Sequence, residues 1–221
     1  MRLVKRTLEL LAVTVVAAGV APADTFYNNL GTAVSGYGSV AGYQGLWNSF
    51  STGSKAENLT DVQVKLEQLA PDPPTPSVTI QLYANSGNKP GAVLLTIGSI
   101  NDSQVSPTGG TYDFPVNPGY ALSANTRYWI GITTSTGSVI EWAWNDESVS
   151  AATGTGTAGE YHCYGTSSCV ANGNDPFLMM VTGTVPSPTV PMLTPVALVA
   201  LGLLLTAIPL WMLRKKRPLP I

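Results

Sequence analysis

The sequence predicts an all-β fold, a jelly-roll-like antiparallel β-sandwich, flanked by an N-terminal signal helix and a C-terminal transmembrane helix. The first observation is composition. With 22 Gly, 17 Pro and only 11% charged residues in 221, a coiled coil or helical bundle is excluded. The second is that short apolar or alternating runs separated by turn residues fill residues 24–185. The third is that uninterrupted apolar runs occur at the two chain ends.

The N-terminal end, residues 1–23, has the pattern of a secretory signal peptide. Three basic residues within the first six precede an apolar run from Leu10 to Val20, and Ala21 and Ala23 flank a proline just before Asp24. A basic start, a short apolar stretch and an A-x-A site are typical of a cleaved signal, whereas a membrane span needs about 20 apolar residues. We expect export and cleavage between Ala23 and Asp24.

The C-terminal end predicts a membrane anchor. Residues 195–213 are apolar and uncharged, which is long enough to cross a bilayer as a helix, and Trp211 sits where an interfacial aromatic residue belongs. Four basic residues follow: Arg214, Lys215, Lys216 and Arg217. By the positive-inside rule the tail 214–221 is cytoplasmic, and the chain before the helix lies outside the cytoplasm. The proline-rich residues 186–194 form an extended stalk.

The part between these ends is acidic. Residues 24–194 contain twelve acidic residues against four basic ones, a net charge of −8, although the whole chain has a formal net charge of only −2. The basic residues are Lys55, Lys65, Lys89 and Arg127. An acidic surface keeps a domain soluble and repels polyanions, so we expect no nucleic-acid partner.

Two pairs of predicted strands have a clear period-2 pattern. Residues Leu59–Leu69 and Val78–Leu82 alternate apolar with polar side chains, and we expect them to be antiparallel neighbours. Residues Arg127–Thr134 and Val139–Asn145 flank a Ser-Thr-Gly-Ser segment and are a candidate hairpin.

The other strands are bounded by turn signals. Asn85–Gly91 is a turn cluster that precedes a strand at Ala92–Ile97, another strand covers Tyr112–Val116, and Phe177–Val185 is the last. Counting these with shorter runs, we expect eight to ten strands.

Cys163 and Cys169 are the two cysteines of the chain, and His162 is its single histidine. In an exported domain, two cysteines so close in sequence predict a local disulfide. A zinc site needs three or four ligands, and the familiar Cys-x-x-Cys spacing is absent. We therefore expect no metal and no cofactor.

Catalytic residues are not indicated by any motif. A Ser-His-Asp or Cys-His unit would have to use His162, and no G-x-S-x-G sequence is present. A glycosidase needs two carboxylates, which leaves Glu141, Asp146, Glu147 and Glu160 open as candidates, although surface acids are far commoner than catalytic ones. Oxygen-rich loops at 146–147 and 172–175 could hold Ca²⁺ but match no known calcium motif, so turns are the preferred interpretation. We expect a protein that is not an enzyme.

Aromatic residues are the candidate ligand contacts. Trp142 and Trp144 share strand parity with Ile140 and are expected in the core. Trp129 has the opposite parity to its apolar neighbours, which leaves an exposed position open to it, and Tyr43 and Trp47 lie in a glycine-rich segment. Core packing is the preferred interpretation for most of these rings, and a glycan site built on Trp129, Tyr43 and Trp47 is the alternative hypothesis.

Ahead of the apolar C-terminal run lies a short motif formed by Val190, Pro191, Met192, Leu193, Thr194 and Pro195. With the run and the basic cluster that follow, it resembles the tripartite sorting signals of Gram-negative bacteria called PEP-CTERM and IPTL-CTERM. It is closer to the second type, whose motif is Ile-Pro-Thr-Leu-Ser: Pro191 and Leu193 match it, and Val190 stands for the Ile. The resemblance implies a partner, a sorting transpeptidase of the exosortase type.

The body of the chain, roughly Thr25 to Val185, resembles the domain called choice-of-anchor R. The resemblance rests on the segments 27–31, 44–50, 80–85 with 89–91, and 122–130. That family carries diverse C-terminal anchors, and the resemblance implies a location at the cell surface or in the extracellular matrix of a bacterium that exports exopolysaccharide.

The sequence thus predicts a non-catalytic exported protein with a structural or adhesive role. We expect it to be anchored in the inner membrane facing the periplasm, or to reach the cell surface or exterior after sorting. Its expected partners are the membrane, the sorting enzyme and extracellular polysaccharide. The alternatives are a carbohydrate-binding module and, more distantly, a secreted hydrolase.

Overall fold

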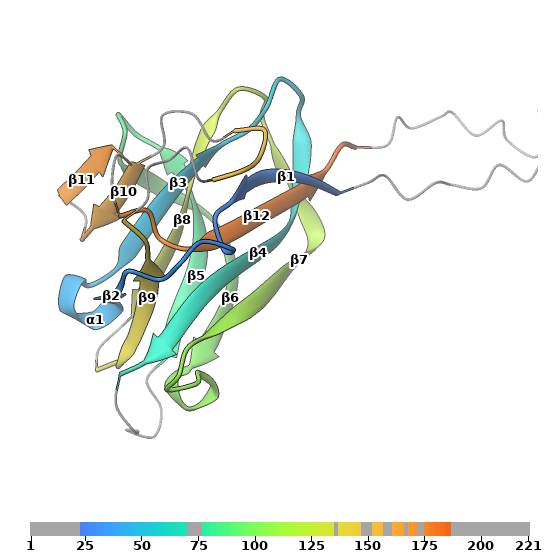
Figure 1. The fold of residues 1–221 in the computed structure, drawn as a ribbon. Coiled ribbons are helices and arrows are strands. Elements are labelled where there is room, and N and C mark those ends of the chain that lie inside the picture. The colour runs from blue at the N-terminus through green and yellow to red at the C-terminus, as the bar shows by residue number, and fades with distance from the viewer. Residues whose placement is uncertain are drawn as a thin grey trace, which may run out of the picture. The chain divides into compact units, whose positions relative to one another are not determined.

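The computed structural model describes residues 23–69, 77–134, 137–146, 152–156, 161–165, 168–171 and 175–186. The predicted signal helix up to Ala21, the sorting motif 190–195, the apolar run 195–213 and the basic residues 214–217 lie outside the described residues. Within them, no helix is long and apolar enough to cross a membrane. The described chain is an all-β sandwich of two antiparallel sheets, as the composition and the turn spacing predicted (Figure 1).

Sheet A contains six strands centred on β4. They are β1 (Ala23–Asn28), β2 (Gly36–Ser39), β4 (Glu57–Gln68), β7 (Gly110–Leu122), β9 (Ile140–Trp144) and β12 (Met179–Thr184). One edge of β4 pairs with β7, and the other pairs first with β12 and then, at its last three residues, with β9. Strand β1 pairs with β12, and β2 pairs with β9.

Sheet B also contains six strands, in the order β11-β10-β3-β8-β5-β6. They are β3 (Leu46–Ser51), β5 (Ser77–Asn85), β6 (Pro90–Asn101), β8 (Arg127–Thr134), β10 (Tyr161–Tyr164) and β11 (Ser168–Ala171). Two short helical turns, α1 (Val40–Tyr43) and the 3-10 turn η1 (Asp102–Gln104), complete the described elements. The described residues thus contain twelve strands where eight to ten were expected, because β2, β10 and β11 are four-residue strands without an apolar alternation.

The core lies between the two sheets. Alternate residues of β4 and β5 point inward, so Val64 and Leu66 of one sheet and Ile80 and Leu82 of the other belong to one buried cluster. Trp142 joins this cluster and stacks on Phe177 at 4.7 Å between ring centroids, which confirms its expected core position. Burying large aromatic and aliphatic side chains supplies most of the driving force for a sandwich of this size.

The pairing expected between the first two strands is wrong. Strand β4 lies in sheet A and β5 in sheet B, so they face each other across the core and do not share hydrogen bonds. The period-2 pattern identifies the apolar face of each strand correctly. Two such faces can meet a common core from opposite sheets as well as from one sheet, so the pattern does not determine the partner.

The hairpin expected from β8 and β9 is also wrong, because these consecutive strands lie in different sheets. Asp102 fixes the connection between them. Its buried carboxylate accepts hydrogen bonds from the Ser138 hydroxyl and from the backbone N–H of Val139, both at 2.8 Å. The segment is thereby held beside η1, and β9 enters sheet A instead of returning along β8.

The predicted turn cluster after β5 connects the two strands of a hairpin. Strands β5 and β6 pair antiparallel, and Ser86 and Lys89 exchange backbone hydrogen bonds around Gly87 and Asn88. Both central residues have positive φ values, 56° and 63°, as a tight two-residue hairpin turn requires.

Both ends of the described domain emerge at one end of the sandwich (Figure 1). Ala23 is paired with Thr184 and Asp24 with Gly183 in the β1–β12 ladder. Strand β1 therefore starts at the predicted cleavage site. The opposite end of the sandwich, where α1 and η1 lie, carries neither terminus of the domain.

Candidate functional site

The structure buries Trp129, in agreement with the preferred core interpretation and against the glycan contact that its parity left open. Its parity was assigned correctly, because Ile130 and Ile132 belong to the main core and Trp129 does not. Its side chain is nevertheless 0% exposed, since it packs with Tyr83, Trp47 and the disulfide cysteine Cys163 in a second cluster on the other face of sheet B. A side chain that points away from the main core is exposed to solvent only where no other residue covers that face of the sheet.

Trp47 is buried in the same cluster. It pairs with Gly131 of the neighbouring strand β8, and its ring meets Tyr83 edge-on at 6.1 Å between centroids. A Cβ atom at Gly131 would collide with both rings, so the absence of a side chain there makes room for them. Neither indole offers a face to solvent, which removes Trp47 and Trp129 as sugar-stacking platforms in this conformation.

Tyr43, the third predicted contact, is exposed. It lies on α1 with 48% of its surface accessible. Tyr164 of β10 supports its ring from the side, at 5.0 Å between centroids. Burial, together with the nearby Asp175 and Tyr43, raises the pKa of Tyr164 to about 12. The supporting hydroxyl is therefore protonated at physiological pH, and the pair presents one accessible aromatic ring.

The predicted disulfide is confirmed. Cys163 and Cys169 are directly opposed in the β10–β11 ladder and their sulfurs are bonded. The bond fastens β11, the outermost strand of sheet B, to β10. Next to Cys163, the ring of His162 is only 2% exposed and lies edge-on to Tyr164 and Phe177.

Glu141 is one member of a half-buried carboxylate pair in sheet A. It is directly opposite Glu67 in the β9–β4 ladder, and the Tyr37 hydroxyl hydrogen-bonds the Glu67 side chain. Burial raises the pKa of Glu141, and the charge of Glu67 adds to the effect. Like charges directly opposite in a sheet destabilise it.

A second carboxylate pair involves Asp61, which lies nearer the start of β4 than Glu67 does. The side chains of Asp61 and Asp113 hydrogen-bond each other, and burial together with this contact raises the pKa of Asp61 to about 6. When two carboxylates lie this close together, sharing one proton between them is more favourable than ionising both.

The remaining candidate acids are not gathered into a site. Asp146 is exposed and accepts a hydrogen bond from the Ser35 hydroxyl at 2.6 Å. Glu147, Glu160 and residues 172–174 lie outside the described residues. In the part of the chain that the structure describes, no group of three or more His, Cys, Asp or Glu side chains could hold a metal ion.

A polar pocket of about 540 Å³ lies at the end of the sandwich where the chain ends emerge. Its walls come from the ends of β5 and β7, the start of β8, and the loop 123–126 between β7 and β8. Its polar and aromatic lining residues include Asn85, Tyr120, Asn125, Arg127 and Tyr128. The volume is in the range of small-ligand sites, about 300–1,000 Å³.

Thr52, a buried residue that follows β3, holds the loop of this pocket. Its hydroxyl donates to the Ser123 carbonyl at 2.6 Å and accepts the N–H of Thr126 at 2.9 Å. The N–H of Asn125 bonds to the Gly53 carbonyl at 2.8 Å. These contacts fix the backbone of the loop at this end of the sandwich. The side chains of the loop are therefore preorganised before a ligand binds.

Arg127 is held at the pocket by contacts on two sides. Its Nη1 donates to Oδ1 of Asn88 at 2.5 Å, and its guanidinium lies 4.6 Å from the ring centroid of Tyr161. Sequence reasoning noted Arg127 as an isolated cation but did not identify the pocket, because its lining comes from three separate segments. The one signal available was a single basic residue in the acidic second half of the domain.

Comparison with protein-family models and with curated proteins finds no match to this chain.

Proposed function

We propose that this chain is a non-catalytic exported surface protein with a structural or adhesive role at the cell surface or in an exopolysaccharide matrix. The proposal combines the signal peptide, the C-terminal anchor and the resemblance to choice-of-anchor R domains. The observation that carries it is the position of the chain ends. Because Asp24 pairs with Gly183, the first and last strands of the described domain begin and end side by side, which suits a domain tethered through its C-terminal side.

The same proposal includes a jelly-roll fold. Four antiparallel pairs are nested along the sequence: β5 with β6, β4 with β7, β3 with β8, and β1 with β12. Successive pairs alternate between sheet B and sheet A. Nested pairs that alternate between two sheets result when one long hairpin is rolled up on itself. An eight-stranded jelly roll has this arrangement. Strands β2, β9, β10 and β11 are additions to that frame.

The anchor is tested by locating the full chain in cell fractions. In a variant with Arg214, Lys215, Lys216 and Arg217 replaced by Gln, the stop at the membrane is weakened, and the protein should shift away from the membrane fraction. Replacing Lys65 alone by Gln is the control, because it removes a charge from the sandwich and leaves the C-terminal end intact. An unchanged distribution of the four-residue variant would contradict the anchor.

Processing of the C-terminal end by an exosortase-type enzyme is tested separately from the anchor. If the motif 190–195 is read by such an enzyme, the exported protein loses its C-terminal helix, and its mass falls accordingly. Mass spectrometry of the surface fraction, with Pro191→Ala as the variant, checks this. The same mass for the surface form and the full unprocessed chain would contradict processing.

A carbohydrate-binding module is the second candidate function, and the exposed ring of Tyr43 favours it. Tyrosine rings supply a rigid apolar face on which a sugar ring can lie. A glycan array probed with the full chain and with Tyr43→Ala tests this function. Binding that the substitution abolishes would support the module, and absence of binding to every glycan would reject it.

A further inference from the structure

We propose that the Arg127 pocket binds a carboxylate-bearing saccharide unit of an extracellular polysaccharide. The inference rests on the proposed surface function and names its partner. Arg127 would pair with the carboxylate, Asn85 and Asn125 would bond to hydroxyls, and Tyr120 would contact the sugar ring. All four side chains line the same pocket.

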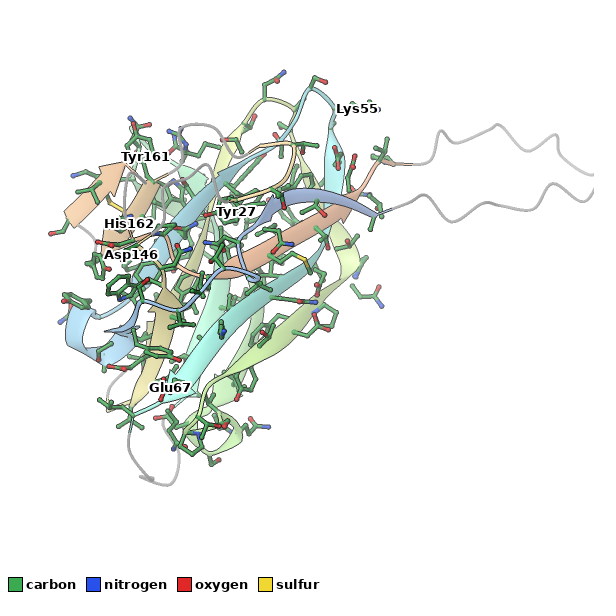
Figure 2. The ribbon with its side chains drawn as sticks, viewed as in Figure 1. Tyr27, Lys55, Glu67, Asp146, Tyr161 and His162 are labelled. Atoms are coloured by element: carbon green, nitrogen blue, oxygen red, sulfur yellow. A yellow bond between two sulfur atoms is a disulfide. The ribbon has the colours of Figure 1, made fainter. Side chains whose placement is uncertain are left out.

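The charge of the pocket supports an anionic ligand. Its lining, within the described chain, contains Arg127 and no carboxylate. The turn and the loop beside it carry Lys89 and Lys55, so three of the four basic residues of the exported domain lie at this end, together with the acidic Asp24 and Glu57. Figure 2 shows Lys55 at this end and Glu67 toward the other. An acidic polymer is repelled by a domain of net charge −8 except where the local potential is positive.

The position of Arg127 suits a carboxylate. A guanidinium presents paired N–H groups to the two oxygens of a carboxylate, and the geometry is most effective when the side chain is already ordered. The hydrogen bond to Asn88 and the contact with the Tyr161 ring order it here. Little side-chain entropy is then lost on binding.

The orientation of Asn85 is also fixed. Its Oδ1 accepts the indole N–H of Trp129 at 3.0 Å, which turns the carbonyl side of the amide toward the second cluster. The NH₂ group lies on the other side of the amide and is a donor for hydroxyl or carboxylate oxygens. Pocket walls made of polar side chains and tyrosine rings favour a polar ring-shaped ligand over an apolar one.

Asn125 allows a sharp test. It has φ of 48°, a left-handed conformation that Asp adopts almost as readily as Asn, and its backbone contact with Gly53 does not involve the side chain. Asn125→Asp therefore adds a negative charge to the pocket with little change of shape. The substitution should selectively lower the affinity for an acidic ligand and leave the fold intact.

The experiment measures binding of the full chain, purified in detergent, to immobilised polygalacturonate and to neutral dextran. We expect salt-sensitive binding to polygalacturonate that falls about tenfold or more in both Arg127→Gln and Asn125→Asp, because the first removes a charge-assisted contact and the second places a like charge beside the ligand carboxylate. Lys65→Gln removes the same charge as Arg127→Gln from a strand outside the pocket and should bind like the wild type. Near-ultraviolet circular dichroism establishes that each variant is folded.

Several results would overturn the inference. Equal binding to dextran and polygalacturonate would show that the carboxylate is not recognised, and undiminished binding by a folded Asn125→Asp would place the site elsewhere. Preference for inorganic phosphate as competitor over galacturonate would assign the pocket to a phosphate ligand. The cell fractionation described above is independent of these results, so a correctly located protein that ignores polygalacturonate would refute this inference and leave the surface function standing.

Discussion

The fully buried Trp129 donates its indole N–H to Oδ1 of Asn85 at 3.0 Å, and so connects the second hydrophobic cluster to the rim of the Arg127 pocket. The hydrogen bond joins neighbouring strands of sheet B, β8 and β5. Trp129, a candidate glycan contact in the sequence, is thus buried and fixes the orientation of the Asn85 amide.

The first prediction follows from this contact. Trp129→Phe removes the donor, and Asn85→Ala removes the acceptor. A buried hydrogen bond contributes about 1 kcal/mol net, and removing the large indole adds a packing loss, so Trp129→Phe should lower the free energy of unfolding by roughly 1–3 kcal/mol. Urea unfolding of the full chain measures this.

Asn85→Asp is the matched control for that prediction, because it keeps an oxygen acceptor for the indole. It should retain most of the stability that Asn85→Ala loses. Additive effects of Trp129→Phe and Asn85→Ala in the double variant would show that the two side chains are not energetically coupled.

The second prediction concerns pH. The raised pKa of Asp61, about 6 against an ordinary 3.8, means that the folded chain holds this proton more tightly than the unfolded chain. Stability from this group is therefore present at pH 4 and is lost as the pH rises toward and past 6. Asp61→Asn should remove that pH dependence and stabilise the protein at pH 7 by roughly 1 kcal/mol, after allowance for solvent screening.

Urea midpoints across this pH range check the second prediction. Asp113→Asn serves as the partner variant, because it removes the contact that helps to raise the Asp61 pKa and should shrink the same slope. If Asp61→Asn has the same stability slope between pH 4 and 6 as the wild type, another group is responsible.

The third prediction concerns the disulfide. Cys163 and Cys169 are separated by six positions, and closing so short a loop is worth roughly 2 kcal/mol in the chain-entropy treatment. Replacing both by Ser should lower the melting temperature by several degrees and increase hydrogen exchange most in β11, the edge strand that the bond fastens to β10.

Hydrogen exchange in β1, at the edge of the other sheet, is the internal control for the third prediction. A uniform rise in exchange over both sheets would mean that the disulfide supports the whole sandwich and not its edge alone.

The fourth prediction tests the second cluster. Gly131→Ala places a Cβ atom against Trp47 and Tyr83, whose rings must then move, and should destabilise the protein by about 1–3 kcal/mol. Gly31→Ala is the control, because a Cβ there meets nothing within 4 Å. Tryptophan fluorescence should shift in the first variant only. Equal stability of the two variants would contradict the tight packing at Gly131.

Sequence patterns predicted the class of fold and several of its strands well. Alternation in residues 59–69 and 78–82 identified the buried faces of β4 and β5, and the turn cluster at 85–91 identified the turn between β5 and β6. The cysteine pair predicted its disulfide. These features are local, since they depend on strand periodicity, turn conformation or a short sequence separation.

The candidate site was predicted less well, because exposure and proximity depend on distant segments. Tyr43 is exposed as a contact must be, but Trp129 is buried by Trp47 and Tyr83, which come from two other strands. The Arg127 pocket assembles residues from the ends of β5 and β7 and from the loop before β8. No spacing in the sequence encodes that meeting.

By itself, the sequence determined the all-β class, the apolar face of the main strands, the turn at Asn88 and the Cys163–Cys169 bond. Only the tertiary structure decided which sheet each strand joins, which aromatic rings are covered and where the cation of Arg127 is held. The physical reason is that alternation records the side of a strand that avoids water, whereas partners across a core are selected by packing and by single buried contacts such as those of Asp102 with Ser138 and Val139.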